Sequence, residues 1–402
     1  MKILCLLAGI ALLGFSACQA HETEFEAGVV DRFDFFSLDI GHLENQLALF
    51  AFEGYPAMRT GMALRDGMLY ISDGNGGKIV RYNFFGDLLF MIFNEDTNPR
   101  PISLSTNFAE GEHATRWAIH YPLKDPGRIV VDSRRHIFVE ERLPPERVRF
   151  DQENNVVLDA MLLHFDQNGN FIQYLGQDGI GGTPFPRIVG LYASGTDEIV
   201  VVSRLPGGWN IFWFDPSGAL LYLIMISSSE IPMLPEMDQA LGIVDRIVAV
   251  PDSRQLLIKV DYYKDILGDD YMRLGKELYR SLIWTLNVED GSYIAYTDVP
   301  HYTVPGDTEG VLGKMIYSML GVMPNGIALL YFPIETGHSI LFLNTITGEQ
   351  RRGVINFSSS QLVYHNFSIS PEGMLLGILV DDYQVNLVSW RTDVFLIREE
   401  AL

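Results

Sequence analysis

Residues 59–94 read RTGMALRDGMLYISDGNGGKIVRYNFFGDLLFMIFN, and this stretch decides the fold class. It contains four short apolar runs, Gly61–Leu64, Met68–Ser72, Ile79–Asn83 and Leu88–Phe93, with Gly, Asn and Asp residues between them. Short runs that are rich in Ile, Val, Tyr and Phe and are separated by turn-forming residues are typical of antiparallel strands. The stretch therefore predicts one four-stranded β-meander.

The same pattern recurs five more times toward the C-terminus. The further units begin at Gly127, Ile188, Asp245, Met315 and Asn366. A four-stranded sheet repeated about every 60 residues is typical of a β-propeller, in which each blade buries its faces against its neighbours. The sustained apolar period of a helical solenoid is almost absent. The predicted fold class is therefore all-β, a six-bladed β-propeller of four-stranded antiparallel blades.

The two ends of the propeller are expected to meet. Asp31–Gly41, DRFDFFSLDIG, reads as a lone strand ahead of the first blade. Closed propellers commonly take one strand from the far terminus, because this removes an exposed sheet edge. We therefore expect this N-terminal strand to close the last blade. The pattern predicts a further strand of that blade at Val394–Ile397.

The first 18 residues have the features of an export signal. Lys2 precedes the apolar stretch Ile3–Phe15, which is too short to span a bilayer as a permanent helix. One interpretation is an ordinary cleaved signal with Ala20 before the cut. In the other, Ser16-Ala17-Cys18 resembles a bacterial lipobox, with Phe15 where Leu is usual, a looser form seen among spirochaete lipoproteins.

Cysteine usage favours the lipobox interpretation. The chain has only Cys5, inside the signal, and Cys18, so the mature protein has no disulfide to form. We therefore predict lipid attachment at Cys18. The predicted organisation is a signal peptide over residues 1–18, an acidic tether over 19–28 and a single propeller domain over 29–402. The expected location is the periplasmic side or surface of a bacterial membrane, held by the lipid anchor only.

Charge excludes one class of partner. The chain carries 51 Asp and Glu against 29 Lys and Arg, a formal net charge of -22, and no run of basic residues compensates locally. Such a body is repelled by phosphate backbones, so nucleic acid is not an expected partner.

Parts of the first three units resemble a known repeat. The segments that carry the likeness are Tyr121–Asp132 with Ile137–Val139, and Leu69–Asp73 with Ile79–Asp87. They are similar to the NHL repeat, whose motif is structural rather than catalytic and implies a six-bladed propeller. Together with the lipobox and the acidic body, the arrangement resembles an uncharacterised family of spirochaetal propeller lipoproteins.

Loop lengths distinguish the two faces of the predicted disc. Turns from the first to the second and from the third to the fourth strand of each blade open on one face, and these turns are short. The other face, here called the insertion face, receives the second-to-third turns and the connections between blades. All four long insertions fall there: Glu95–Pro126, Glu141–Asp159, Asp261–Arg280 and Pro300–Gly313. Long loops on a compact fold are usually functional, although tolerated insertion is the alternative.

Aromatic and arginine side chains in these loops are the candidate binding residues, because such side chains anchor most interfaces. The candidates are Arg116, Trp117, His120, Arg142, Arg147, Arg149, Trp209, Tyr262, Tyr263, Tyr271, His301, Tyr302 and His338. For any one of them taken singly, packing of an insertion onto the disc is the favoured role. The expected partner of this face is an envelope protein or a glycan.

No catalytic motif stands out. The nine His residues do not pair at metal-binding spacings, no nucleophile elbow or phosphate-binding loop occurs, and we predict neither a cofactor nor a metal ligand. Asp132, Asp245 and Asn366 are the polar residues expected on the innermost strands, too few to define a site. The leading function is a binding or scaffold module. The alternatives are a hydrolase or lyase with a divalent metal in the central channel and an assembly factor for outer-membrane proteins.

Overall fold

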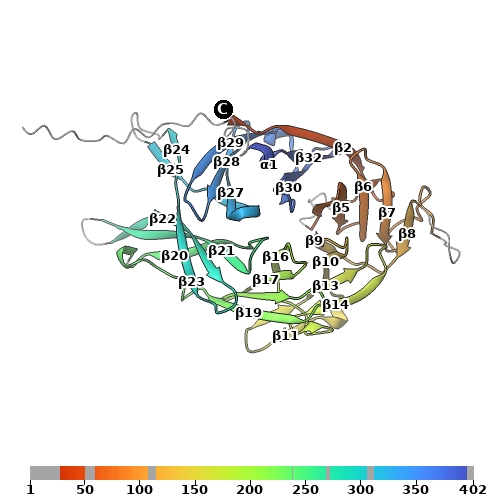
Figure 1. Cartoon of the computed structure of the whole chain (residues 1–402), viewed down its shortest axis with the longest axis horizontal. Coiled ribbons are helices and arrows are strands. Elements are labelled where there is room, and N and C mark those ends of the chain that lie inside the picture. Colours follow the sequence, from red (N-terminus) through yellow and green to blue (C-terminus); the bar gives the residue numbers. More distant parts are fainter. Residues whose placement is uncertain are drawn as a thin grey trace, which may run out of the picture.

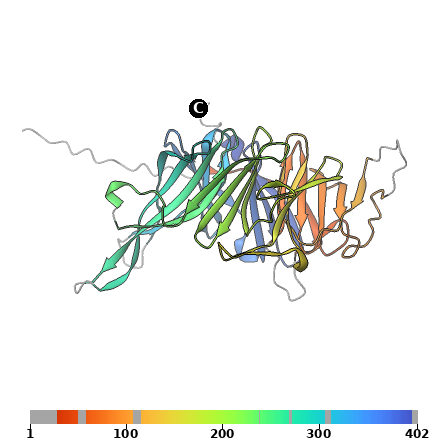
Figure 2. The same ribbon diagram turned by 90° about the horizontal axis from the view of Figure 1, so that it is seen from below.

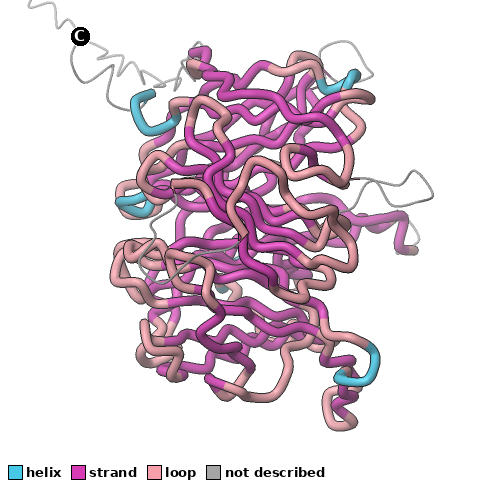
Figure 3. Tube along the Cα trace, turned by 90° about the vertical axis from the view of Figure 1, so that its right-hand side faces the viewer, coloured by secondary structure: helices cyan, strands magenta, loops and turns pink. Residues whose placement is uncertain are grey.

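The protein is a six-bladed β-propeller, as the sequence predicts. A computed structural model of the 402-residue chain describes residues 28–49, 59–106, 115–237, 239–268, 272–305 and 312–395. Figure 1 shows six small sheets arranged as a ring. Strands dominate the chain trace, and helices are confined to short turns (Figure 3). Among the described residues, no helix is long and apolar enough to cross a membrane.

Each blade has four antiparallel strands. In blades one to five, their order along the chain is their order from the channel to the rim, and in blade six the fourth strand comes from the N-terminus. Blade one contains β4 (Gly61–Arg65), β5 (Met68–Asp73), β6 (Lys78–Asn83) and β7 (Leu88–Phe93); blade two contains β9 (Pro126–Val131), β10 (Ile137–Arg142), β13 (Ala160–Phe165) and β14 (Phe171–Gly176); blade three contains β16 (Ile188–Ala193), β17 (Ile199–Leu205), β18 (Gly208–Phe214) and β19 (Leu220–Ser227). Blade four contains β20 (Leu241–Ala249), β21 (Gln255–Leu267), β22 (Arg273–Asn287) and β23 (Tyr293–Val299); blade five contains β26 (Ser318–Met323), β27 (Ile327–Ile334), β28 (Gly337–Asn344) and β29 (Gln350–Asn356); blade six contains β30 (Tyr364–Ile369), β31 (Leu375–Val380), β32 (Gln384–Trp390) and β2 (Arg32–Ile40).

The N-terminal strand closes the ring, which confirms the expected pairing. β2 runs antiparallel to β32, with Arg32 opposite Trp390 and Asp39 opposite Gln384. The strand predicted at Val394–Ile397 is wrong for Val394 and Phe395, which belong to a helix, and the last two residues of the prediction lie outside the described residues. The chain turns after Trp390 into the short helix α1 (Thr392–Phe395), because β2 already occupies the place beside β32.

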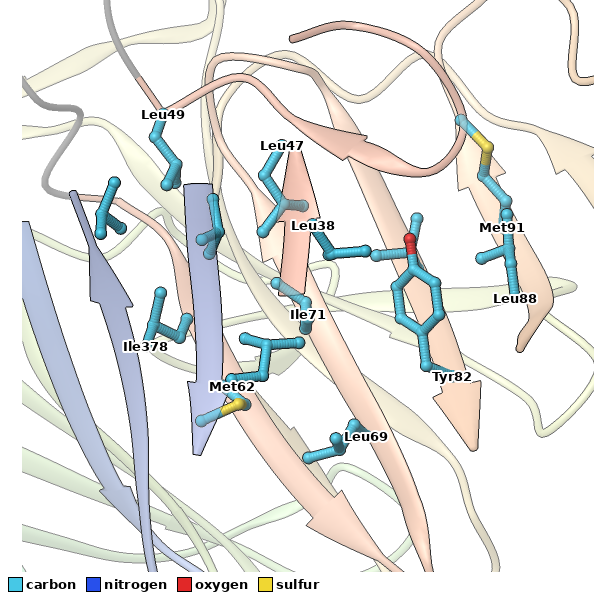
Figure 4. Close-up of a cluster of buried hydrophobic side chains, with 14 of the residues drawn as sticks. Leu38, Leu47, Leu49, Met62, Leu69, Ile71, Tyr82, Leu88, Met91 and Ile378 are labelled. Carbon is cyan, nitrogen blue, oxygen red and sulfur yellow. The ribbon is translucent and has the colours of Figure 1, made fainter. Parts of the chain in front are cut away.

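The core is divided among the blade interfaces, with one buried apolar cluster between each pair of neighbouring blades. Figure 4 shows the cluster at the closing seam, where Leu38 of β2 meets Ile71 of blade one and Ile378 of blade six. Phe36 of β2 packs on Tyr82, a member of this cluster, with ring centroids 5.1 Å apart. The closing strand is therefore held by the next blade as well as by its own sheet.

Four blades carry a short fifth strand outside the fourth. These strands are β8 (Trp117–His120) on blade one, β15 (Gly179–Ile180) on blade two, β1 (Gly28–Val29) on blade five and β3 (Gln46–Leu47) on blade six. Within the described residues, the outer edges of β19 in blade three and β23 in blade four have no such cover.

The long insertions are largely ordered as β-structure. The segment Asp261–Arg280 is not a loop, because it extends β21 and β22 into a hairpin whose register continues to Leu267 opposite Arg273. Figure 2 shows this teal hairpin projecting from one side of the edge-on disc. Blade two adds the helical turn η1 (Pro145–Arg147) and a small hairpin of β11 (Arg149–Asp151) and β12 (Val156–Leu158). The connection between blades four and five forms the hairpin of β24 (Tyr302–Pro305) and β25 (Leu312–Met315).

Candidate functional site

The insertion face is built from strand ends and hairpins rather than from irregular loops. The β21–β22 hairpin projects farthest, and its far end exposes Ile266, Leu267, Met272 and Leu274. Met272 and Leu274 keep 65% and 71% of their surface in contact with solvent. Charged side chains flank this apolar end, since Arg273 pairs with Asp265 at 2.7 Å. An exposed apolar centre with a polar rim is the usual composition of a protein interface.

The small hairpin of blade two repeats this pattern on the same face. Phe150 and Val157 lie directly opposite each other on β11 and β12. Both side chains are largely exposed. Apolar side chains on neighbouring strands form one patch, so this hairpin presents a second apolar contact point next to blade two.

Two of the predicted binding residues lie at the opposite end of the disc. The guanidinium of Arg116 pairs at 3.0 Å with Asp87, in the third-to-fourth turn of blade one. The indole N–H of Trp117 donates to the carbonyl of Asn168, in the corresponding turn of blade two, at 2.9 Å. β8 runs parallel to β7, with Phe90 opposite Trp117, so β8 begins near the short-turn face, which sequence spacing does not reveal. Expecting Arg116 and Trp117 on the insertion face was therefore wrong.

Several other candidates lie at the insertion end of their strands and are held by neighbours. His120 packs edge-on against Phe93 at the end of blade one. Arg142 pairs with Asp125 at 3.4 Å and Asp159 at 3.8 Å. The Arg147 guanidinium lies 5.5 Å from the Tyr174 ring, whereas the side chain of Arg149 is exposed on β11.

The aromatic candidates of blades four and five serve mainly to pack the insertions. Tyr262 is buried, donates to the carbonyl of Pro232 and accepts from the indole N–H of Trp284 at 2.7 Å. Tyr302 stacks on Phe332 with centroids 4.4 Å apart. His338 is buried among aromatic rings, and burial lowers its pKa to about 4, so that it is neutral near pH 7.

Tyr263 and His301 are half-buried. Tyr263 lies opposite Leu241 on β20, and burial of the hydroxyl raises its pKa. Tyr271 and Cys18 lie outside the described residues.

Trp209 is the candidate that lines a pocket. This pocket, with a volume of about 550 Å³, lies between blades three and four on the insertion face. Its wall is formed by the ends of three strands of blade three, by the connection between the blades and by the first residues of β20: Arg187, Val189, Arg204, Trp209, Ser228, Ile231, Leu241, Gly242, Ile243, Val244, Asp245, Arg246 and Ile247. The Arg204 guanidinium stacks over the Trp209 ring at 3.8 Å from its centroid. The sequence analysis did not find the three arginines, because they lie far apart in the chain.

The polar residues predicted near the channel are engaged in contacts between strands and blades. The carboxylate of Asp132 accepts N–H bonds from Arg134 and His136 in its own turn. Asp245 accepts from the backbone N–H of Met319 in blade five at 2.8 Å, and Asn366 donates to the carbonyl of Thr60 at 2.6 Å. Among the described residues, no three His, Cys, Asp or Glu side chains are grouped so that they could hold a metal ion.

Blade two contains a perturbed carboxyl that the sequence did not mark. Glu141 is buried at the end of β10 and accepts the backbone N–H bonds of Lys124 and Asp125 through Oε1. Its Oε2 has no hydrogen-bond partner among the described residues. Burial raises the pKa of Glu141 to about 7. The group therefore changes charge near neutral pH, in a position that links β10 to the connection from blade one.

Comparisons with known proteins identify the fold only. No protein-family model matches the chain, and no curated protein matches its sequence. Among solved structures, an α-L-arabinofuranosidase from Fusarium graminearum with an iminosugar inhibitor is 8% identical, with 90% of this chain and 98% of that chain covered and a TM-score of 0.47. A gluconolactonase from Xanthomonas campestris is 11% identical over 90% and 97% of the two chains, with a TM-score of 0.39. The Dos1 propeller is 11% identical over 89% and 72%, with a TM-score of 0.34.

Proposed function

We propose that this protein is an exported lipoprotein, anchored through Cys18, whose propeller binds an envelope protein through its insertion face. The observation that carries the proposal is the apolar end of the β21–β22 hairpin. Its strands have 13 and 15 residues, so the hairpin extends well beyond the blade and its far residues have no sheet or blade to pack against. Exposed apolar groups at that position gain burial only in a complex.

Charged contacts on the hairpin favour a protein over a glycan as the partner. Lys264 lies over the Tyr279 ring at 3.4 Å, and Lys276 lies 3.6 Å from Asp265. Among the described residues of the hairpin, Tyr279 is the aromatic side chain with the largest exposed fraction, and Lys264 covers one face of its ring. The hairpin end itself offers aliphatic side chains, which bind other apolar side chains rather than sugar hydroxyls.

The direction of the chain at its N-terminus supports this orientation. β1 runs parallel to β29, with Gly28 opposite Gly353 and Val29 opposite Val354, and β29 runs toward the insertion face. Within β1, Gly28 therefore lies nearer the short-turn face and Val29 nearer the insertion face. The roughly ten residues from Cys18 to Gly28 span at most about 35 Å. We propose that this tether holds the short-turn face toward the membrane and leaves the insertion face available.

Binding is tested with matched variants of the intact protein. Leu267→Glu combined with Leu274→Glu places charges on the hairpin end, and Phe85→Glu places one on an apolar site of the short-turn face that is more exposed still. Chemical cross-linking in isolated envelopes, followed by mass spectrometry, is expected to yield one dominant partner with the wild type and with Phe85→Glu. Its yield should fall at least about tenfold in the hairpin variant. Equal yields from all three proteins would contradict the proposal.

The anchor has a separate test. Metabolic labelling with a palmitate analogue should mark the wild-type chain, and Cys18→Ala should abolish the label and release the protein from the membrane. A labelled Cys18→Ala protein would refute attachment at this cysteine.

A further inference from the structure

The pocket between blades three and four combines positive charge with an apolar wall. Arg187, Arg204 and Arg246 all line it. Among the described residues, none of the three guanidinium groups lies within 4.0 Å of a carboxylate. Nearby arginines of the same two blades behave differently, since Arg254 pairs with Glu198 at 2.6 Å and Arg280 with Glu236 at 2.9 Å.

Two of the three guanidinium groups are held in place by neutral partners. Arg204 stacks on Trp209, and its Nη1 donates to the carbonyl of Gly208 at 3.4 Å. Arg246 donates from Nη1 to the carbonyl of Leu320 in blade five at 2.7 Å. Burial lowers the pKa of the Arg204 guanidinium. No carboxylate among the described residues pairs with this group to offset the cost of its desolvation. An unpaired, positioned guanidinium is suited to bidentate contact with an oxyanion.

The one acidic side chain of the wall does not neutralise the arginines. Asp245 Oδ2 accepts from the backbone N–H of Met319 at 2.8 Å and lies 3.4 Å from the buried ammonium group of Lys259. Lys259 is itself paired with Asp261 at 2.8 Å. The negative charge of Asp245 is thus directed toward blade five and Lys259. The pocket is a positive site on a protein whose formal net charge is -22.

We propose that this pocket binds a small organic anion that carries a carboxylate or phosphate group on an apolar body. Arg187 and Arg204 contact the oxyanion, and Val189, Ile231 and Val244 surround the apolar part. A volume of about 550 Å³ is within the range of small-molecule sites. This ligand site is distinct from the hairpin surface of the proposed function, and it stands or fails independently of that surface.

Calorimetric titration of the soluble body, residues 19–402, with benzoate, phenyl phosphate and neutral phenol tests the inference. At least one anion is expected to bind saturably with one site per chain and at least about tenfold more tightly than phenol. Comparison of the two anions identifies which oxyanion the pocket prefers. Absence of saturable anion binding up to about 10 mM, or equal binding of phenol, overturns the proposal.

Variants locate the bound anion. Arg187→Gln and Arg204→Gln are each expected to weaken binding about tenfold, whereas Arg273→Gln, which removes a paired arginine from the hairpin, leaves it unchanged. Thermal unfolding of each variant without ligand shows whether the fold is retained. If Arg273→Gln weakens binding as much as the pocket variants, the anion is held by general charge and the site is not the pocket.

Discussion

Blades three and four differ from the other four blades at their outer edges. Blades one, two, five and six each cover their fourth strand with a short fifth strand, whereas β19 and β23 end the described sheets without one. The same two blades carry the projecting hairpin and the arginine-lined pocket. The covered blades instead contain the closing seam. The covered blades thus include the two that close the ring, whereas blades three and four expose apolar side chains and arginines without a paired carboxylate.

The largest effect is expected at the closing seam. Leu387→Ala removes a fully buried side chain of β32 next to β2 and should lower the free energy of unfolding by about 2–5 kcal/mol. Met225→Ala, at a 74% exposed position on β19, should change it by less than about 0.5 kcal/mol. Urea unfolding monitored by tryptophan fluorescence measures both. Similar losses for the two variants would show that the open edge is as much a part of the stable core as the seam.

Two buried glutamates should respond to pH in opposite directions. Burial raises the pKa of Glu141 in covered blade two to about 7, so its contribution to stability is lost as pH rises from about 4.5 toward 7. Burial alone would also raise the pKa of Glu198 in blade three, but hydrogen bonds from Arg254 and Trp213 hold that pKa below its usual range. Glu198 therefore contributes to the free energy of unfolding at pH values above its pKa in the unfolded chain. This contribution is lost as the pH falls through its pKa in the folded protein.

The two glutamine variants separate these effects. At pH 8, Glu141→Gln should stabilise the protein by roughly 1–3 kcal/mol, and the gain should vanish below about pH 4.5. Glu198→Gln should destabilise it by roughly 1–3 kcal/mol at pH 7, with the loss shrinking in acid. Thermal unfolding from pH 4 to pH 8 tests both. A loss of stability at pH 8 for Glu141→Gln would mean that its carboxylate is compensated in the folded protein.

The smallest effect on stability is expected at the open edge of β19. The strand reads LLYLIMIS, has no charged residue, and exposes Leu221, Leu223 and Met225. Uncovered apolar edge strands promote association. Leu223→Lys should leave the free energy of unfolding within about 0.5 kcal/mol of wild type and reduce concentration-dependent association in light scattering. Association that persists unchanged in the variant would place the contact elsewhere.

The alternation of apolar and turn-forming residues along the sequence predicted the strands of the blades, which depend on local interactions. Most blade strands were found because alternating apolar residues between turn residues suffice to define them, and closure followed from the need to remove an edge. The strand predicted from Val394 onward failed at its described residues, Val394 and Phe395, because β2, from the other end of the chain, occupies the place beside β32. The Asp261–Arg280 segment was predicted as a loop because its charged residues interrupt the apolar pattern. It forms a hairpin because its two halves, the ends of β21 and β22, pair with each other.

The candidate site was harder to predict because its parts meet only in three dimensions. Arg187, Arg204 and Arg246 come from three strands of two blades, and no spacing in the sequence relates them. Trp209 was found by residue type alone. Arg116 and Trp117 were misplaced because a loop that begins on one face can cross the rim.

The pairing of β2 with β32 also determines when the ring can form. Ser37 and Asn386 share a hydrogen bond across 349 positions of sequence. In a chain that is exported unfolded and N-terminus first, β2 crosses the membrane before β32. The propeller of such a chain closes only after β32 has crossed as well, because the two strands pair in the last blade. The arrival of β32, the later of the two strands, therefore sets the time at which the ring closes.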